Sequence, residues 1–298
     1  MKGHIVLPEF YRTRFTDDYK HLLGMVAKEF RFKIEYSDNP QIAQDTEVVI
    51  LFAVPHHMRP HVLQDMASIP RPIRVIGYMK DIHHFGNPQA EDAYKRMFER
   101  YDVILSSADE LFHGLYPEYV GKMLYFPDFF GPHERYELPY NEKPTMRCLV
   151  SGTVSQEVYP LRQHILSNGS EEYLDYLPGP LAGHDVIGDK YARLLNSYFC
   201  CATCSSVFNY TLAKYWEITA AGSLLIANTT SDLEKLGMVP NEHFVPINFE
   251  NAICTIKKVL ADPERYEPIR RAGMEYVREN HSIRNRFETM KGVINGMS

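Results

Sequence analysis

A strand–turn–helix–strand pattern in the C-terminal half of the chain restricts the fold more than any other feature. An apolar run at 198–202 predicts a buried strand, and Ser205, Ser206 and Asn209 mark a turn after it. Apolar side chains at helical spacing then predict a helix over about 210–221, with Gly222 at its C-terminal cap and a second buried strand at 223–227. Strands that alternate with helices in this order favour a parallel sheet.

The rest of the chain repeats the alternation of strands and helices. In the first half, short apolar runs predict strands at 4–8, 32–36, 47–53, 74–79, 102–107 and 122–126, with helices at 17–30, 60–67, 89–101 and 110–116. In the second half, further strands are expected at 146–151, 173–177 and 243–247. One helix is expected to end at Leu166, and others are expected at 189–197, 251–260, 263–280 and 283–294. The predicted fold class is therefore α/β, with two Rossmann-like doubly wound domains and C-terminal helices.

A segment rich in proline and aromatic residues, 127–144, separates the two alternating halves and has no periodicity. Such composition is typical of an interdomain connection. We expect an N-terminal Rossmann-like domain at 1–130, a linker at 131–144 and a C-terminal domain with closing helices at 145–298. No strand is followed by GxGxxG, which argues against a dinucleotide oxidoreductase, and GxxxxGK[ST] does not occur, which excludes a P-loop NTPase.

Composition narrows the function classes. The chain has 298 residues, 45% hydrophobic and 23% charged, which is typical of an ordinary soluble protein. The net charge of −6 argues against a nucleic-acid partner. No apolar run could span a bilayer and no signal peptide begins the sequence, so we expect a cytoplasmic protein. The five cysteines include a CxxC at 201–204 without a second ligand pair, which predicts buried free thiols in a reducing compartment.

One carboxylate interrupts the apolar helix predicted at 210–221. Glu217 lies between Trp216 and Ile218. One interpretation is that Glu217 pairs with Lys214 or points to solvent. The other uses its position, because ligands of open α/β sheets bind outside the carboxyl ends of strands and near helix N-termini. The amides at 209–211 would then hold a phosphate, and Glu217 would bind ribose hydroxyls.

The run from Glu217 to Gly222, followed by the apolar strand Ser-Leu-Leu-Ile, resembles an element of GT-B glycosyltransferases. The similarity is to glycosyltransferase family 4 and the related spore-maturation-type group, and it is strongest over about 146–290. It implies a GT-B fold, in which 1–130 is the acceptor domain and 145–298 the nucleotide-sugar-binding domain. It also implies a glutamate, here Glu217, that binds the ribose of a nucleotide-sugar. The family 4 motif has a second glutamate eight residues earlier, which holds the donor sugar; this chain has Asn209 there.

The same resemblance implies further nucleotide-sugar-binding residues. Small residues after the predicted strand at 146–151, Gly152 and Thr153, would let the backbone approach a pyrophosphate. Arg162 and Lys214 are the candidate cations for the diphosphate, because the leaving group gains negative charge in the transition state. A surface arginine and an i, i+3 salt bridge to Glu217 are the respective alternatives. The turn after the strand at 198–202 contributes the remaining candidates, Ser206, Asn209, Tyr210 and Thr211.

Candidate catalytic residues follow a strand of the first half. Asp81, His83 and His84 come directly after the strand predicted at 74–79, and each could accept a proton from an acceptor hydroxyl or bind the sugar. The same cluster could instead hold a metal ion, although the resemblance implies a metal-independent enzyme. His56 and His57 follow the preceding strand in the same way, and loop polarity alone would explain either pair.

The sequence therefore predicts a GT-B glycosyltransferase without a cofactor, which moves a sugar from a nucleoside-diphosphate-sugar such as a UDP- or GDP-sugar. Its acceptor is a hydroxyl of a glycan or another compound. A sugar-nucleotide epimerase of similar plan is one alternative. A degenerate GT-B module that binds a nucleotide or glycan without turnover is the other, and Asn209 is the residue that keeps it open.

Overall fold

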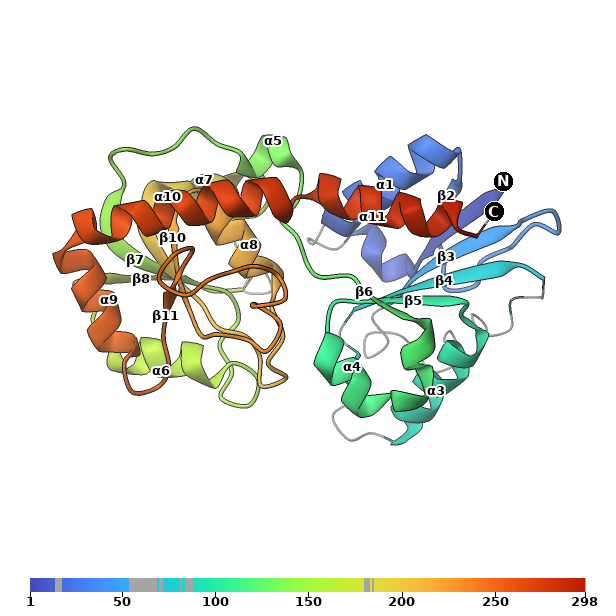
Figure 1. The fold of residues 1–298 in the computed structure, drawn as a ribbon, viewed down its shortest axis with the longest axis horizontal. Helices are drawn as coiled ribbons and strands as arrows, with labels where there is room; N and C mark the ends of the chain where they lie inside the picture. The colour runs from blue at the N-terminus through green and yellow to red at the C-terminus, as the bar shows by residue number, and fades with distance from the viewer. Residues whose placement is uncertain are drawn as a thin grey trace. The chain divides into compact units, whose positions relative to one another are not determined.

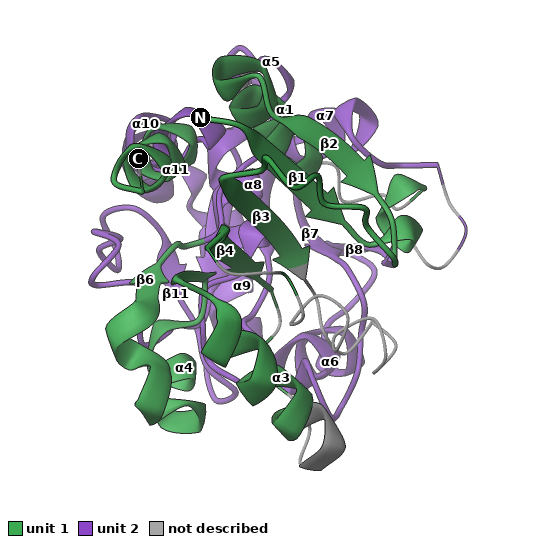
Figure 2. Ribbon diagram, turned by 90° about the vertical axis from the view of Figure 1, so that its right-hand side faces the viewer, with its two compact units in different colours: residues 1–127, 286–298 green, residues 128–285 purple. Residues whose placement is uncertain are grey.

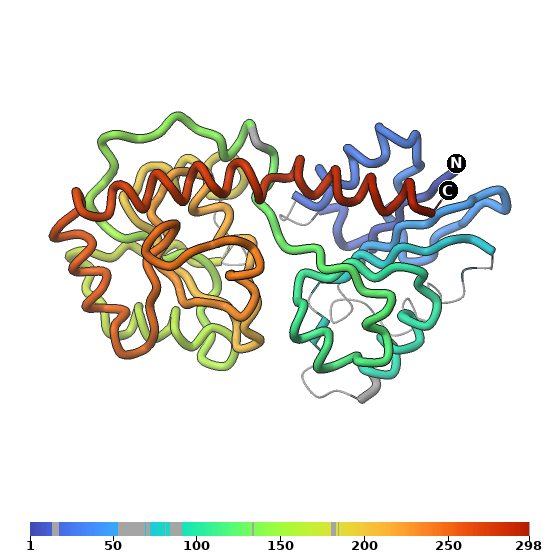
Figure 3. Tube along the Cα trace, in the orientation of Figure 1, coloured from blue at the N-terminus to red at the C-terminus, as the bar shows by residue number. Residues whose placement is uncertain are grey.

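The computed structural model describes residues 1–13, 18–53, 69, 72–80, 82–83, 88–179, 183 and 185–297. The chain divides into two compact units, residues 1–127 with 286–298 and residues 128–285 (Figure 2). The sequence-based boundaries placed all of 145–298 in the second domain, whereas residues 286–298 group with the first unit. The chain leaves the second unit after residue 285, and its last residues belong to the first unit (Figure 3).

The first unit is built on a parallel sheet with the strand order β2-β1-β3-β4-β5-β6 in its described residues (Figure 1). The strands are β1 (Gly3–Leu7), β2 (Lys33–Tyr36), β3 (Val48–Ala53), β4 (Arg74–Met79), β5 (Val103–Ser106) and β6 (Met123–Tyr125). The helices are η1 (Glu9–Arg12), α1 (Asp18–Phe30), α3 (Pro88–Arg100), α4 (Asp109–Leu115) and η3 (Pro117–Lys122). The helix predicted at 60–67 lies outside the described residues.

Aromatic side chains build part of the core of the first unit. The Phe52 ring lies edge-on to Tyr11 and to Tyr78, with centroids 5.0 and 5.1 Å apart, and Tyr78 contacts Phe126 in the same way at 5.1 Å. The last helix, α11 (Ile283–Asn295), adds the buried Arg286, which donates a hydrogen bond to the Pro127 carbonyl at 2.9 Å. Burial lowers the pKa of Arg286 to about 10, although Tyr125 and Tyr78 favour its charge.

The second unit is built on a parallel sheet in the order β11-β10-β9-β7-β8. Its strands are β7 (Thr145–Ser151), β8 (Leu174–Leu177), β9 (Tyr198–Ala202), β10 (Leu224–Ala227) and β11 (Val245–Pro246). Its helices are α5 (His133–Tyr136), α6 (Pro160–Asn168), α7 (Asp189–Ser197), α8 (Ala213–Ala220), α9 (Ala252–Ala261) and α10 (Pro263–Asn280). The predicted α/β fold class, with two doubly wound parallel sheets and C-terminal helices, is confirmed.

Helices cover both faces of this second sheet. On one face, side chains from α6 and α9 pack with Cys148, Cys200 and Leu224 into a continuous apolar core. On the other face lie α7, α8 and α10, and α8 contacts both β10 and α10. A strand buried on both faces must be apolar throughout, which explains the near-continuous apolar sequence of β9 and β10. Gly222 ends α8 with a φ of +88°, as its predicted capping position requires.

The strand order of the second sheet reverses at β7. The chain passes from β7 to β8 on one side and then returns to β9 on the other side of β7. In doubly wound sheets, the carboxyl ends of the two strands at such a reversal flank a crevice in which ligands bind. The loops after β7 and β9 are therefore where the fold of this unit places a site.

The segment predicted as a linker, 131–144, is part of the second unit and packs against its helices. Arg278 of α10 donates hydrogen bonds to the carbonyls of Tyr136 and Leu138 at 3.3 and 2.8 Å. Arg270, which is 1% exposed, donates to the Asn141 carbonyl at 3.1 Å and to the Gly222 carbonyl at 2.7 Å. Because the guanidinium groups of Arg270 and Arg278 hold these backbone carbonyls, the segment is anchored to α10 and to the end of α8.

The cysteines are free thiols, as predicted. Cys148, Cys200, Cys201 and Cys204 are buried and Cys254 is exposed. Burial raises the pKa of the Cys201 thiol far above its ordinary value, so this thiol stays protonated. No helix among the described residues combines the length and the apolarity that a membrane crossing requires.

Candidate functional site

The loop after β7 brings two cationic side chains together. Gly152 has a φ of +107°, which disfavours any residue with a side chain. A Cβ added there would lie 2.7 Å from Lys214 Cε and 3.1 Å from Arg162 Nη1. Glycine is therefore required twice, by its backbone conformation and by the side chains around it. The two cations come from α6 and α8 and converge on one stretch of backbone at the strand-order reversal.

Arg162 is built into the second unit. The residue is 1% exposed, so the interpretation as a surface arginine is wrong. Its Nη1 donates to the Thr153 carbonyl at 2.6 Å and its Nη2 to the Thr203 hydroxyl at 3.1 Å, while its guanidinium lies 4.4 Å from the Tyr159 ring centroid. Since Thr153 follows β7 and Thr203 follows β9, Arg162 ties together the two loops that flank the crevice.

Lys214 does not form the salt bridge to Glu217 that was the alternative interpretation of its spacing. Its Nζ donates to the Tyr191 hydroxyl at 3.0 Å, and no described carboxylate lies within ion-pair distance of it. Tyr191 is also hydrogen-bonded to Ser151 Oγ at 2.9 Å, at the end of β7. Burial lowers the pKa of Lys214, but Tyr191 and Glu217 outweigh this effect, and the net pKa lies above its ordinary value. Lys214 is therefore a charged group at neutral pH.

Glu217 lies one turn further along α8 and is half-buried. Its Oε1 accepts a hydrogen bond from the Tyr136 hydroxyl at 3.2 Å. Tyr136 is 2% exposed, and Arg278 holds its backbone carbonyl. The segment that the sequence suggested as a linker thus supplies a side chain that holds the candidate ribose-binding carboxylate.

The turn after β9 is fixed by residues that follow β10. Asn209 adopts the left-handed conformation, with a φ of +54°, and its carbonyl accepts a hydrogen bond from Ser231 Oγ at 3.1 Å. The amide and hydroxyl of Thr211 both donate to the buried Asp232 carboxylate, at 3.1 and 2.6 Å. Ser206 and Tyr210 are buried beside them. This turn is rigid because a buried carboxylate satisfies its polar groups.

The same bonds explain why α8 begins at Ala213 and not near residue 210 as expected. The buried Asp128 accepts a hydrogen bond from the Ala213 amide at 3.1 Å and so caps the helix from another part of the chain. The amides of Asn209 and Thr211, which were expected to hold a phosphate, donate to Ser206 and Asp232 instead. The convergence of positive charge is at Gly152, not at this helix terminus.

Sequence reasoning did not find Tyr136, Tyr191, Asp128 or Asp232. Tyr136 and Asp128 lie in the aperiodic segment, where spacing predicts no partner, and Tyr191 lies on a helix of ordinary amphipathic pattern. Asp232 could have been found, because the polar run from Asn228 to Asp232 directly follows a buried strand. Asn228 belongs to that run, and its side-chain oxygen accepts a hydrogen bond from the Ser205 amide at 2.9 Å.

In the first unit the structure describes only part of the predicted catalytic cluster. Asp81 and His84 lie outside the described residues, as do His56 and His57. His83 is 8% exposed, close in sequence to Lys80, which is 6% exposed. Lys80 Nζ donates to Ser107 Oγ at 3.2 Å, which joins the carboxyl ends of β4 and β5. Within the described ranges, no three His, Cys, Asp or Glu residues form a group able to hold a metal ion.

Comparison with known families identifies this architecture. Residues 141–292, which include β7, Arg162, Lys214 and Glu217, match the glycosyl transferase-like family. The chain belongs to this family. No curated protein matches the sequence of this glycosyltransferase.

Solved structures show the fold of the glycosyltransferase along its whole length. Sucrose-phosphate synthase from Thermosynechococcus elongatus has a TM-score of 0.68 at 11% identity, with 100% of this chain and 99% of that chain covered. Anabaena HepE in complex with UDP and glucose has a TM-score of 0.66 at 10% identity, covering 99% and 100% of the two chains. An alpha-glucosyltransferase in complex with UDP and a 13-mer DNA has a TM-score of 0.62 at 11% identity, covering 99% of each. The fold is GT-B.

Proposed function

We propose that this glycosyltransferase uses a nucleoside-diphosphate-sugar as donor and that its second unit binds the nucleotide. The observation that carries the proposal is the convergence of Arg162 and Lys214 on Gly152 at the strand-order reversal. Two cations held close together repel each other, and a bound dianion would offset this cost. UDP is the first nucleotide to test, because HepE and the alpha-glucosyltransferase are both structures in complex with UDP.

In this proposal each residue has a separate task. Lys214 and the backbone at Gly152 and Thr153 bind the diphosphate, which gains charge as the glycosidic bond to the donor breaks. Arg162 contributes positive charge and holds the loops after β7 and β9 in place. Glu217, oriented by Tyr136, binds the ribose hydroxyls. The turn that contains Ser206, Asn209, Tyr210 and Thr211 lies beside the donor.

The acceptor hydroxyl is assigned to the first unit, as the sequence predicted for residues 1–130. His83 lies at the carboxyl end of the first sheet and is the described candidate for proton transfer, with Asp81 and His84 as its neighbours in sequence. We also propose that transfer needs neither a metal ion nor a cofactor. EDTA then leaves activity unchanged, and loss of activity that a divalent ion restores would return the metal site to consideration.

A second candidate function is nucleotide or glycan binding without turnover. The observation that favours it is Asn209, where the family 4 motif has a charged glutamate. Ser231 holds the backbone of Asn209 in a left-handed turn, and the exposed side-chain amide of Asn209 can bond to a hydroxyl but carries no charge. Release of free nucleoside diphosphate from a donor in the presence of an acceptor separates a transferase from a binding module.

The testing experiment is titration calorimetry of the full chain with UDP, GDP, ADP, CMP and dTDP. For the preferred nucleotide, Lys214→Met should weaken binding by about tenfold, because it removes one charge-assisted contact to the diphosphate. Lys190→Met is the matched control, since Lys190 is an exposed lysine of the same unit and pairs with Asp185 among the described residues. The proposal fails if no nucleotide binds, or if both lysine variants weaken binding equally.

A further inference from the structure

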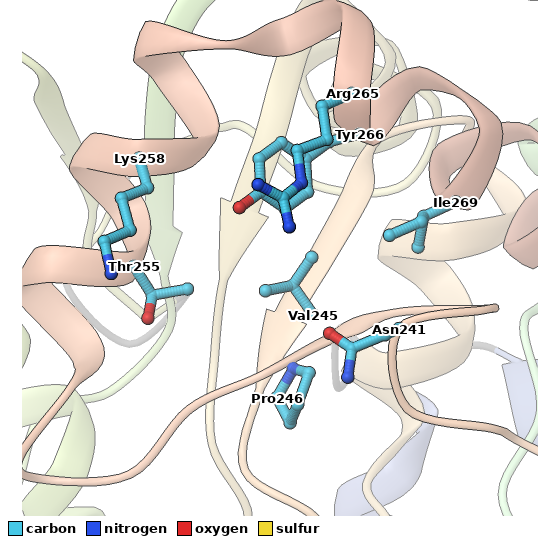
Figure 4. Close-up of a pocket in the computed structure, with 8 residues that line it drawn as sticks. All are labelled: Asn241, Val245, Pro246, Thr255, Lys258, Arg265, Tyr266 and Ile269. Carbon is cyan, nitrogen blue, oxygen red and sulfur yellow. The ribbon is translucent and has the colours of Figure 1, made fainter.

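A second cavity lies in the second unit, away from the loops after β7 and β9. Figure 4 shows it between α9, α10 and the edge strand β11, with a volume of about 520 Å³. Strands β10 and β9 separate β11 from β7, so this cavity is distinct from the crevice around Gly152. Its size falls within the range of small-molecule sites.

Several polar side chains line the cavity and have no partner among the described residues. Lys258 comes from α9 and Arg265 from the first turn of α10 (Figure 4). Neither forms an ion pair or a side-chain hydrogen bond in the part of the chain that the structure describes; Arg265 only lies near the Tyr266 ring, 5.8 Å from its centroid. The side chains of Asn241 and Thr255 also lack hydrogen bonds to described residues.

The cavity lining combines positive charge with an apolar floor. No aspartate or glutamate is among the eight residues that line it, so Lys258 and Arg265 make it a cationic site. Val245, Pro246, Ile269 and the Tyr266 ring form the floor, and Tyr266 and Ile269 pack against the core of the unit. The floor is therefore held in place, while the cations are available for a ligand.

We propose that this cavity binds a small phosphate monoester whose sugar or base ring lies on the Tyr266 floor. Two cations from different helices suit a dianionic phosphate, which accepts hydrogen bonds from both. The hydroxyl of Thr255 and the amide of Asn241 can bond to ring hydroxyls or ring nitrogens. A bare phosphate would leave most of the cavity and all of the apolar floor uncovered. The site does not depend on the proposed donor site.

The experiment is calorimetric titration of the full chain with ribose 5-phosphate and with AMP, in the presence of saturating UDP. Ribose and adenosine are the controls without phosphate, and inorganic phosphate is the control without a ring. Saturable binding of a phosphorylated probe, tighter than its controls, is expected. If AMP binds more tightly than ribose 5-phosphate, the base lies on Tyr266; the reverse order assigns the floor to the sugar. The titration is repeated in Lys214→Ala, where unchanged affinity shows that the probe is not in the donor site.

Neighbouring lysines on α9 provide a charge-matched test. Lys258→Glu should weaken the phosphorylated probe by at least about tenfold, whereas Lys257→Glu should leave its affinity within about twofold. Lys257 lies outside the cavity, near the Tyr173 ring. Both variants replace a lysine with a glutamate, so they change the net charge equally and differ only in whether the change is in the cavity. Arg265→Gln, on the other helix, is a second test should Lys258→Glu fail to fold. Absence of saturable binding, or equal effects of Lys257→Glu and Lys258→Glu, overturns the proposal.

Discussion

The hydrogen bond from Tyr136 to Glu217 allows a sharp test of how the candidate ribose site is organised. Tyr136→Phe removes only the hydroxyl, because phenylalanine keeps the ring that packs 6.0 Å from Phe130. Bonds to charged groups contribute about 1.5–3 kcal/mol. At 3.2 Å the contact is longer than a usual hydrogen bond from hydroxyl to carboxylate, and Glu217 is only partly buried, so we expect about 1 kcal/mol.

That energy corresponds to a loss of about fivefold in UDP affinity if Tyr136 acts by orienting Glu217. The assay is a double-mutant cycle by calorimetry with Tyr136→Phe, Glu217→Gln and the double variant. Because Tyr136 acts through Glu217, adding Tyr136→Phe to Glu217→Gln should cost almost nothing further. For turnover, the donor KM should rise in Tyr136→Phe while kcat stays unchanged.

A purely structural role for Tyr136 gives different results. It would lower the melting temperature and leave UDP affinity unchanged, or it would weaken UDP equally with and without the Glu217 carboxylate. Either outcome refutes the positioning argument. Unchanged UDP affinity in Glu217→Gln alone would remove the ribose role of Glu217 itself.

Further predictions concern charge, pH and thiols. Gly152→Ala should abolish UDP binding and lower the melting temperature, since the new Cβ meets Lys214 at a strained φ. Asp175→Asn should cost about 1 kcal/mol at pH 7, discounted for exposure, because Arg147 holds both carboxylate oxygens at 2.7 Å. The bond from Arg147 holds the pKa of Asp175 below its ordinary 3.8, although burial opposes this effect. The ion pair therefore stabilises the folded state above pH 3.8, and this stabilisation is lost as the pH falls below that value. In urea unfolding, the difference in free energy of unfolding between wild type and Asp175→Asn should be smaller at pH 3 than at pH 7. Ellman's reagent should modify Cys254 quickly and the buried cysteines only on unfolding; more than one fast thiol would contradict the buried core.

Much of the fold follows from local pattern in the sequence. The strand at 198–202 and the helix at 189–197 occur where predicted, because elements buried on one or both faces have a regular pattern of apolar residues. Glu217 was found for the opposite reason, since it is a charged residue that interrupts such a pattern. The start of α8 was wrong by about three residues, because Asp128 and Asp232, remote in sequence, bond to the amides there.

The rest of the site depends on contacts that spacing does not encode. Spacing offered Glu217 at i, i+3 as an alternative partner for Lys214, yet Lys214 bonds to Tyr191 on another helix. Arg162 sits on a helix that reads as partly exposed, but its guanidinium is buried between two loops. Tyr136 reaches Glu217 from a segment with no periodicity. The sheet topology brings each partner near. The sequence therefore predicted which side chains belong to the site, but not which of them are hydrogen-bonded to one another.

The division of the chain has a consequence for biosynthesis. The second unit is one continuous stretch, 128–285, whereas the first unit joins residues 1–127 to 286–298. Ribosomes deliver the chain from its N-terminus, so the second unit can close its core while the first still lacks α11 and the buried Arg286. The unit synthesised first is therefore the one completed last. Before residues 286–298 are synthesised, the part of the first unit that buries Arg286 is exposed to solvent. At this stage we expect the nascent protein to bind chaperones or to aggregate.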